Sequence, residues 1–339
     1  MLKYFKTMED GKIDQLESYT DGCWVDLINP TDDEIDDVCA LTDVPEEMLK
    51  AALDEEETAR FERDDGIFLC LLDTPIITDV DDGDVYETIP MAIIDNSRCV
   101  ITVSMRGNSV LGDFISNRVA IDTSMPVSFL LTFMMGNAKK FLSNLRQLDK
   151  KSQRVQAELH RSMKNQELIQ MLGIENSLVY FSTSLTANLG VYNRLGRLPQ
   201  ITENETYQDL FDDVVIETRQ AMEMCTIYRD ILSGTMDAFA SIISNNVNVV
   251  MKLLTVITII ISVPTLIASL WGMNVPVPFA NLSWGFWLLI VICIVVTAIS
   301  SYFLVKSTNS IRIKTPKQVK RGRGHHASDR RAGDKKARK

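Results

Sequence analysis

The feature that most constrains this chain is a run of 53 consecutive residues, Leu253 to Val305, without a single Asp, Glu, Lys or Arg. A helix that crosses a bilayer needs about 20 apolar residues. The run is too long for one span and has room for two spans joined by a short turn. It therefore predicts a membrane protein with two C-terminal transmembrane helices.

Charge is distributed as unevenly as apolar residues. Residues 306–339 hold 13 Lys and Arg against Asp329 and Asp334, a net charge of +11. The whole chain carries −10, so the other 305 residues carry −21. A strongly acidic domain and a basic tail thus flank the membrane segment. The tail is expected either to lie on anionic lipid at the inner leaflet or to be solvated.

The first 125 residues alternate β-rich runs with helical ones, which predicts a small α/β domain. A helix is expected to start at the N-cap Thr31, because acidic residues follow it at once, and a second short helix is expected at residues 46–53. Val, Ile and Thr are enriched in four runs bounded by Gly, Asp or Asn, and these predict strands. The expected strands are residues 23–28, 66–77, 87–95 and 98–104.

Helical periodicity replaces this pattern from about residue 128 onward. Residues 129–159 and 165–195 have apolar residues at helical spacing and few helix breakers. From about Glu203 no proline occurs until Pro264. A helix of that length spans roughly 90 Å, too long for one soluble domain. We expect it to begin in the cytoplasm and to continue through the membrane.

The flanks of the two spans indicate their orientation. Lys252 and Lys306 mark a cytoplasmic side, and Trp271, Trp284 and Trp287 mark the opposite interface. Both termini are then cytoplasmic, in a multi-pass protein of the cell (inner) membrane. The expected segments are an α/β domain (1–125), a helical region (126–249), transmembrane helix 1 (250–271), an extracellular loop (272–283), transmembrane helix 2 (284–305) and a basic cytoplasmic tail (306–339).

Polar residues of the first span lie on one helical face. Their spacing alternates between three and four residues, and the series continues into the cytoplasmic half of the helix. Such a 3.5-residue repeat keeps one seam towards partner helices. Small polar residues are common where membrane helices pack, so packing is one explanation. The other is a hydrated pore on the axis of a symmetric oligomer. The seam comprises Asp237, Ser241, Ser244, Asn248, Met251, Thr255, Thr258, Ser262, Thr265 and Ser269.

Gly272, Met273 and Asn274 follow the first span directly and precede the only other span. With the preceding residues 228–271, they resemble the signature region of the CorA family of magnesium transporters. The coarse plan of the chain fits that family over its whole length. The resemblance implies a funnel-shaped homopentamer in the membrane, in which the long helices line the pore and the α/β domains are cytoplasmic.

The resemblance also implies roles for single residues. Gly272, Met273 and Asn274 would form an outer mouth that selects hydrated Mg²⁺. Asp237 would lie at the cytoplasmic mouth, and Met251 and Leu254 would form a hydrophobic constriction that closes by dewetting. The family places Leu254 in the pore, whereas the periodicity favours Thr255. Other positions that match the family's pore lining are Asn248, Ser262, Thr265 and Ser269.

Mg²⁺ is expected both as the transported ion and as a regulator. In the family, Mg²⁺ bound between neighbouring cytoplasmic domains holds the pore shut. Asp213 falls on the family's gating acid. Its partner is expected from the acidic turn of a neighbouring subunit, which offers Asp79, Asp81, Asp82 and Asp84; a merely solvated turn is the alternative.

Two features depart from the family. Residues 275–283 lack the acid that many members carry after the motif, so the Asn274 amides and backbone carbonyls would have to act without it. Pro264 lies one residue later than expected from the family, so the bend of the helix there is expected to differ.

Other functions remain as alternatives. One is the zinc-transporting branch of the same superfamily, and Co²⁺ or Ni²⁺ are further candidate ions. Another is a non-conducting, membrane-anchored sensor. The sequence contains no phosphate-binding Gly loop, HExxH or GxSxG motif, so we expect no enzyme. Nucleic acid is not an expected partner. The six cysteines have no CxxC spacing and are expected to be buried, reduced thiols.

Overall fold

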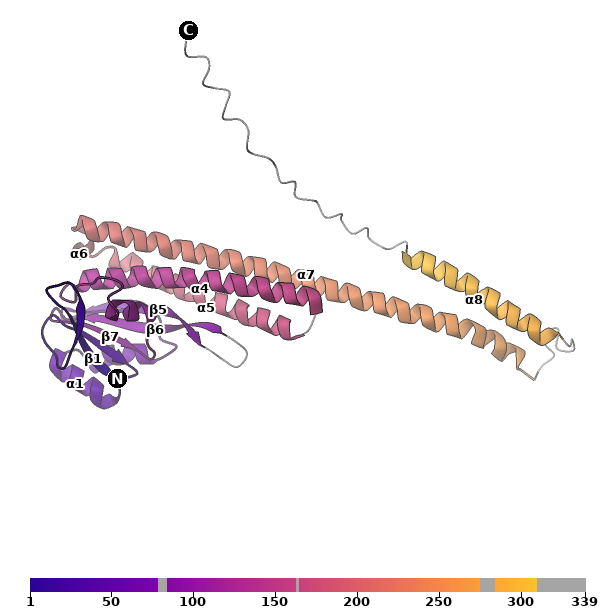
Figure 1. Cartoon of the computed structure of the whole chain (residues 1–339), viewed down its shortest axis with the longest axis horizontal. Helices are drawn as coiled ribbons and strands as arrows, with labels where there is room; N and C mark the ends of the chain where they lie inside the picture. The colour runs from indigo at the N-terminus through magenta and orange to yellow at the C-terminus, as the bar shows by residue number, and fades with distance from the viewer. Residues whose placement is uncertain (79–83, 163–164, 275–283, 310–339) are drawn as a thin grey trace, which may run out of the picture. The chain divides into compact units, whose positions relative to one another are not determined.

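The computed structural model of the chain describes residues 1–78, 84–162, 165–274 and 284–309 (Figure 1). The chain divides into two compact units, Met1–Ala240 and Ser241–Lys339. The first contains a β-sheet and several helices. The second contains the two helical segments that the uncharged run predicted. The mixed α/β domain, the very long helix and the C-terminal helix are therefore confirmed.

A seven-stranded sheet forms the centre of the first unit. Its strand order is β2-β1-β3-β7-β6-β5-β4, and of the neighbouring pairs only β3 and β7 run parallel. The strands are β1 (Leu2–Thr7), β2 (Ile13–Leu16), β3 (Trp24–Ile28), β4 (Arg60–Asp64), β5 (Ile67–Thr78), β6 (Val85–Asp95) and β7 (Val100–Ser104).

The four predicted strands correspond to β3, β5, β6 and β7, which are four consecutive interior strands of the sheet. The sequence analysis missed β1, β2 and β4. Both edge strands, β2 and β4, belong to this group. Edge strands are often short and charged, and β4 reads RFERD. Such strands lack the apolar pattern that identified the central ones.

Helices cover both faces of the sheet, so alternate strand residues enter different cores. Along β5, Leu69 and Leu71 pack into one core and Cys70 and Leu72 into the other. The first core is covered by α1 (Asp32–Thr42), α2 (Glu46–Lys50) and the 3₁₀ turn η1 (Ala51–Leu53), and the second by helices later in the chain (Figure 1). Thr31 caps α1 as expected, in a full capping box with Glu34.

The opposite face carries α3 (Ser109–Ile115), α4 (Pro126–Ser162), α5 (Asn165–Leu195), α6 (Pro199–Thr202) and the first part of α7 (Glu205–Trp271). Farther along, α4, α5 and α7 share a core of their own, which includes Phe141, Phe181 and Cys225. Gly136 lets α3 approach α4, because a Cβ there would meet Val110 Cγ1 at 2.5 Å. Cys23, Cys70, Cys99 and Cys225 are buried free thiols, whereas Cys39 and Cys293 are half-buried.

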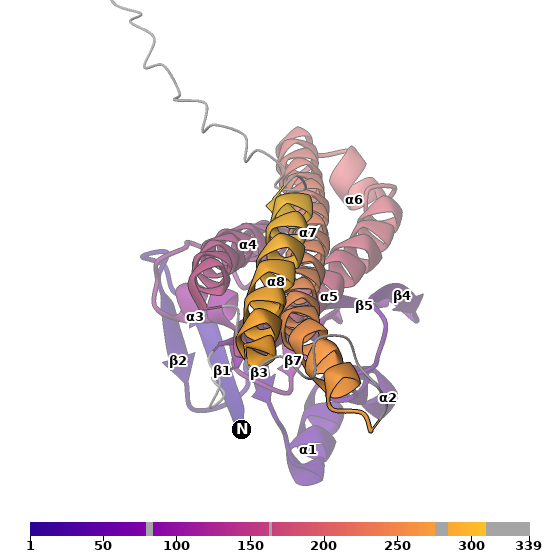
Figure 2. The same cartoon turned by 90° about the vertical axis from the view of Figure 1, so that its right-hand side faces the viewer.

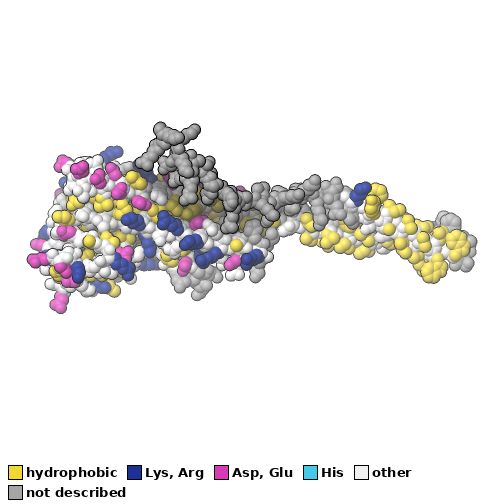
Figure 3. Space-filling model, turned by 45° about the horizontal axis from the view of Figure 1, so that its top comes forward, with side chains coloured by type: hydrophobic (Ala, Val, Ile, Leu, Met, Phe, Trp, Pro, Cys, Tyr) yellow, Lys and Arg dark blue, Asp and Glu magenta, His cyan; other side chains and the backbone are white. Residues whose placement is uncertain are grey.

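The second unit consists of the last part of α7 and of α8 (Gly285–Asn309), which lie side by side in both views (Figures 1 and 2). Both helices are long and apolar enough to cross a membrane. Hydrophobic side chains cover this unit, whereas charged side chains gather over the first (Figure 3).

A carboxyl group is buried inside the sheet domain. Asp26, on β3, is 1% exposed, and its Oδ1 accepts a hydrogen bond of 2.7 Å from Thr102 Oγ1. The same hydroxyl oxygen accepts a hydrogen bond of 2.8 Å from Trp24 Nε1. Removal of the carboxylate from water raises the pKa of Asp26 from 3.8 to about 6, although the hydrogen bond from Thr102 opposes this.

This pKa predicts a pH dependence of stability. Between about pH 4 and 6 the folded state binds more protons at Asp26 than the unfolded state, so a rise in pH favours unfolding. Two pKa units correspond to about 3 kcal/mol at most. We expect Asp26→Asn to remove this loss of folding stability with rising pH. The measurement is urea unfolding at pH 4.5 and 7.5, followed by the fluorescence of Trp24.

The exposed Asp64 on β4 provides the matched control, because Asp64→Asn makes the same chemical change outside the core. Its stability should follow the wild-type pH curve. If the free energy of unfolding of Asp26→Asn changes between pH 4.5 and 7.5 in parallel with that of wild type, burial does not shift the pKa of Asp26.

Candidate functional site

The polar seam of α7 is exposed throughout. Within the second unit it runs from Ser241 to Ser269, and every seam residue in this range is classed as exposed. Asp237 is exposed on the same helix within the first unit. The two predicted constriction residues, Met251 and Leu254, are 57% and 54% exposed. The nine seam positions from Ser241 onward thus form a continuous accessible stripe on one helix.

The opposite side of α7 is less accessible. The half-buried residues between Val256 and Trp271 recur with the same three-and-four spacing but out of phase with the seam: Val256, Ile259, Ile260, Val263, Pro264, Ile267 and Trp271. At about 100° per residue this stripe lies roughly opposite the seam. Half-buried residues of α8 include Cys293, Val296 and Ser300. Because α8 lies beside α7 (Figure 2), the apolar stripe packs towards α8 and leaves the seam uncovered.

Three seam hydroxyls are bonded to their own helix. Thr255 Oγ1 donates to Met251 O at 2.9 Å, Thr258 Oγ1 to Leu254 O at 2.8 Å and Thr265 Oγ1 to Ile261 O at 2.8 Å. Each hydroxyl hydrogen is thereby occupied. The oxygen lone pairs, which accept hydrogen bonds, stay on the exposed side. This part of the seam therefore presents acceptors rather than donors.

A shallow hollow lies on the exposed side of α7 beside Pro264. It is lined by Ile261, Ser262, Val263, Thr265, Leu266 and Ser269, three of which are seam residues. Pro264 has no N–H, so the carbonyl group of Ile260 loses its usual helical donor. The neighbouring Ile261 carbonyl retains a side-chain donor, Thr265. The helix nevertheless remains continuous from Glu205 to Trp271.

The Gly-Met-Asn motif begins where α7 ends. Gly272 N donates to Ala268 O at 3.0 Å, which closes the last turn. A Cβ at Gly272 would lie 3.4 Å from that carbonyl oxygen, a contact that a small side chain can accept. Met273 and Asn274 are exposed. The loop residues 275–283 lie outside the described part of the chain.

The predicted regulatory acids are only partly placed. Asp213 is exposed on α7, and Asp84 is exposed just before β6. Lys151 Nζ donates to the backbone oxygen of Asp84 at 2.6 Å. Asp79, Asp81 and Asp82 lie outside the described residues. Within residues 1–78, 84–162, 165–274 and 284–309, no three His, Cys, Asp or Glu side chains meet to hold a metal ion.

Comparison with known proteins decides the family. The family described as CorA-like Mg²⁺ transporter protein matches residues 20–306. The chain belongs to this family. It is therefore a transporter-family protein and not an enzyme. Its two candidate spans and its Gly-Met-Asn motif agree with that membership.

Two curated relatives and two solved structures are similar to the chain. The cobalt/magnesium transport protein CorA of Methanocaldococcus jannaschii is 28% identical over 295 residues, which cover 84% of this chain and 90% of the relative. That of Thermotoga maritima is 34% identical over 110 residues, 32% of this chain and 31% of the relative.

The solved structures support the fold. The complete structure of the CorA magnesium transporter from M. jannaschii matches with a TM-score of 0.78 and 24% identity, over 89% of this chain and 96% of that one. The full-length CmaX protein matches with a TM-score of 0.66 and 15% identity, over 91% and 97%. Both matches extend over about nine tenths of this chain.

The sequence analysis did not predict the hydrogen bonds of the seam. Periodicity identified which residues share a face, but not that the threonine hydroxyls donate to the helix. A threonine in a helix can bond the carbonyl four residues earlier, so this pattern was a usable signal. The buried Asp26 network carried no comparable signal, because Thr102 lies 76 residues away from Asp26.

The seam predicts a pattern of chemical accessibility. In a Cys39→Ser, Cys293→Ser background, we expect Ser262→Cys and Ser269→Cys to react with a charged thiol reagent in membranes. Thiolate forms in water and not in apolar surroundings. Ile260→Cys and Ile267→Cys, on the α8-facing stripe, should react at least about tenfold more slowly. A tenfold ratio corresponds to a rise of about one unit in the pKa of the introduced thiol.

Ser300→Cys on α8 is the matched control, because it makes the same substitution on a span but off the seam. It should remain unreactive. Equal rates at Ser262, Ile260 and Ser300 would mean that the seam is a packing surface without water.

Proposed function

We propose that the chain is a channel-like transporter that carries Mg²⁺ into the cell, driven by the membrane potential. The observation that carries this proposal is the uncovered polar seam on α7, which lies opposite the α8-facing stripe and leads to Gly272-Met273-Asn274. Membership in the CorA-like Mg²⁺ transporter family supports the same ion.

The chemistry of the seam suits a hydrated cation. Mg²⁺ gives up its waters reluctantly, and those waters direct hydrogens outward. Thr255, Thr258 and Thr265 present oxygen acceptors, because their own hydrogens are bonded to the helix. The seam from Ser241 to Ser269 carries no charge, so no carboxylate holds the ion too tightly to release it. The ion passes with its water shell largely intact.

A pore requires several copies of the chain. Two spans per chain cannot enclose a hydrated ion, and a cyclic arrangement with α7 innermost places the seams on a common axis. The family resemblance favours five subunits. In this arrangement Gly272, Met273 and Asn274 form the outer mouth, and Met251 and Leu254 form a ring that closes by dewetting. Asp237 lies at the inner mouth.

The proposed orientation places both termini in the cytoplasm of a cell whose inner membrane the protein crosses twice. Lys252 and Lys306 mark the inner interface, and Trp271, Trp284 and Trp287 the outer one. An inside-negative potential then drives the ion inward. It favours entry by about 4.6 kcal/mol per 100 mV for a divalent ion.

Regulation by internal Mg²⁺ completes the proposal. Asp213 is an exposed carboxylate outside the membrane span, and carboxylate oxygens are ligands that Mg²⁺ prefers. One carboxylate does not make a site, so the partner comes from the region around Asp84 in a neighbouring subunit. Bound Mg²⁺ bridges the two subunits and favours the closed state. Loss of Mg²⁺ leaves the carboxylates to repel each other.

One experiment tests both the identity of the transported ion and the role of the Gly-Met-Asn motif as the outer mouth. In proteoliposomes with an imposed inside-negative potential, wild type should take up Mg²⁺, and Asn274→Ala should reduce uptake at least about tenfold. The reason is the loss of an amide oxygen that holds the hydrated ion, since a hydrogen bond to a charged group contributes about 1.5–3 kcal/mol. Gly272→Ala should act similarly, because an added methyl group fits the chain but narrows the mouth.

Asn176→Ala, at an exposed position on α5, is the matched control and should transport like wild type. Uptake of Co²⁺, which the names of both curated relatives include, is measured in parallel. Retained Mg²⁺ uptake in Asn274→Ala would exclude the motif as the selecting mouth. Uptake of Zn²⁺ alone would assign the chain to zinc transport, and absence of all flux would favour a sensor.

The regulatory assignment is tested at Asp213. We expect Asp213→Asn to raise the internal Mg²⁺ concentration needed for half-closure about tenfold, because one charged ligand is lost. Asp212→Asn changes the net charge equally at the adjacent exposed position and should close like wild type. An unaltered Mg²⁺ dependence in Asp213→Asn would refute this assignment.

A further inference from the structure

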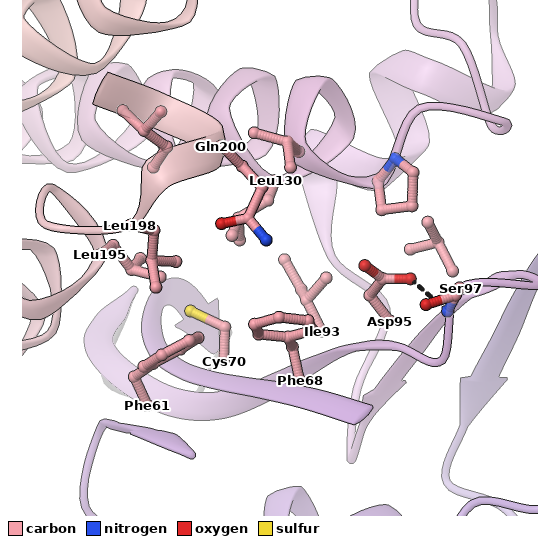
Figure 4. Close-up of a pocket in the computed structure, with 14 residues that line it drawn as sticks. Phe61, Phe68, Cys70, Ile93, Asp95, Ser97, Leu130, Leu195, Leu198 and Gln200 are labelled. Carbon is pink, nitrogen blue, oxygen red and sulfur yellow. Dashed lines mark hydrogen bonds between the residues drawn. The ribbon is translucent and has the colours of Figure 1, made fainter. Parts of the chain in front are cut away.

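The first unit contains a cavity of about 170 Å³ that the proposed transport does not use (Figure 4). The cavity lies between the sheet and the helices α4, α5 and α6. Strands β4 to β7 supply its floor, the first turn of α4 supplies one wall, and the turn from α5 into α6 supplies another.

The register of the sheet explains the floor. Phe61, Cys70 and Ile93 are direct partners on β4, β5 and β6, so their side chains point to the same face. In the next row Phe68 on β5 is paired with Asp95 on β6. The floor is therefore apolar and aromatic except at one position. The Phe61 and Phe68 rings lie with their centroids 6.1 Å apart.

Asp95 lies at the end of the cavity opposite Phe61 and Leu198 (Figure 4). Its Oδ1 accepts a hydrogen bond from Ser97 N at 2.8 Å. Burial raises the pKa of Asp95, although this hydrogen bond opposes the rise. A carboxylate in such a chamber is stabilised by a cation.

The chain itself does not supply that cation in its described part, where Asp95 forms no ion pair. Two arginines of this part of the sheet domain have other contacts. Arg98 pairs with Asp43. Arg63 lies in the same cross-strand row as Phe68 and Asp95, and its guanidinium stacks over the Phe68 ring at 4.9 Å from the centroid. The second contact also shows that the Phe68 ring attracts positive charge.

We propose that this cavity binds a small molecule with one aromatic ring and a single ammonium group. The ring would lie against Phe61 and Phe68, and the ammonium group would donate hydrogen bonds to Asp95. The side chain of Gln200 reaches the cavity from α6 and offers an amide next to the ligand (Figure 4). The proposal is independent of ion transport.

Size and charge both restrict the ligand. An engineered apolar cavity of about 150 Å³ holds benzene, so about 170 Å³ accommodates one ring with a short substituent. A neutral hydrocarbon would bury the carboxylate further without a partner, which costs free energy. An anion would be repelled by Asp95.

The test uses benzylammonium as the probe and the full chain in detergent micelles. Binding is measured by isothermal titration calorimetry against a micelle blank, with benzyl alcohol as a neutral ligand of the same shape. Wild type should bind benzylammonium more tightly than benzyl alcohol. Asp95→Asn should weaken the binding of benzylammonium at least about tenfold, because a charge-assisted hydrogen bond is lost. It should not weaken the binding of benzyl alcohol.

Two variants that fill the cavity complete the experiment. Leu130→Trp and Val127→Phe each add a ring inside the α4 wall, and either should abolish binding of both probes. Asp64→Asn, an exposed carboxylate on β4, is the matched control and should bind like wild type. Three results would each overturn the proposal. The first is that wild type fails to bind benzylammonium, the second that Asp95→Asn binds it as tightly as wild type, and the third that a folded cavity-filling variant still binds it fully.

Discussion

A bilayer offers no hydrogen-bond partner to a polar group, and the architecture of this protein follows from that constraint. Within the uncharged run, residues 253–271 and 285–305 are helical, so their backbone N–H and C=O groups find partners within the helix. The same constraint applies to side chains. Thr255, Thr258 and Thr265 satisfy their hydroxyl hydrogens on carbonyl groups of α7 itself. The helix thus carries a polar stripe without needing a neighbour for each hydroxyl group.

The two units of the chain solve different packing problems. In the first, the sheet is covered on both faces, and its alternating side chains supply two separate cores. In the second, α7 and α8 cover each other along one stripe, and the remaining surface stays exposed in a single chain. For a membrane protein, lipid covers part of such a surface. A polar stripe gains nothing from lipid, so in a membrane it would need either a partner helix or the aqueous axis of the proposed oligomer.

How much of the structure could be predicted from the sequence depended on how far apart in the sequence the interacting residues lie. The seam follows from a repeat within one helix, the two candidate spans from a run without charged residues, and α7 from a long stretch without proline, so the local sequence was sufficient to predict them. The central strands β3, β5, β6 and β7 also carried enough Val, Ile and Thr to be identified. The edge strands β2 and β4 did not, because half of an edge strand's environment is solvent.

Features that depend on strand register could not be predicted from the sequence. The Asp95 cavity exists because Phe68 faces Asp95 and Phe61 faces Cys70 across strands. Nothing in the sequence around any one of these residues indicates that pairing. The regulatory acids pose a harder problem, because the partner proposed for Asp213 would belong to a second subunit. Membership in the CorA-like family supports the expectation, but a single chain contains only half of such a site.

The threonine hydrogen bonds of α7 have a consequence for anions. A cation turns the hydrogens of its water shell outward, whereas an anion turns the water oxygens outward and requires hydrogen donors along its path. Thr255, Thr258 and Thr265 have already committed their hydrogens to the helix backbone. A lining of this kind discriminates by polarity of hydration rather than by net charge. If the seam lines the proposed pore, chloride would meet no free hydroxyl hydrogen at these three threonines, and this would disfavour it without a carboxylate to repel it.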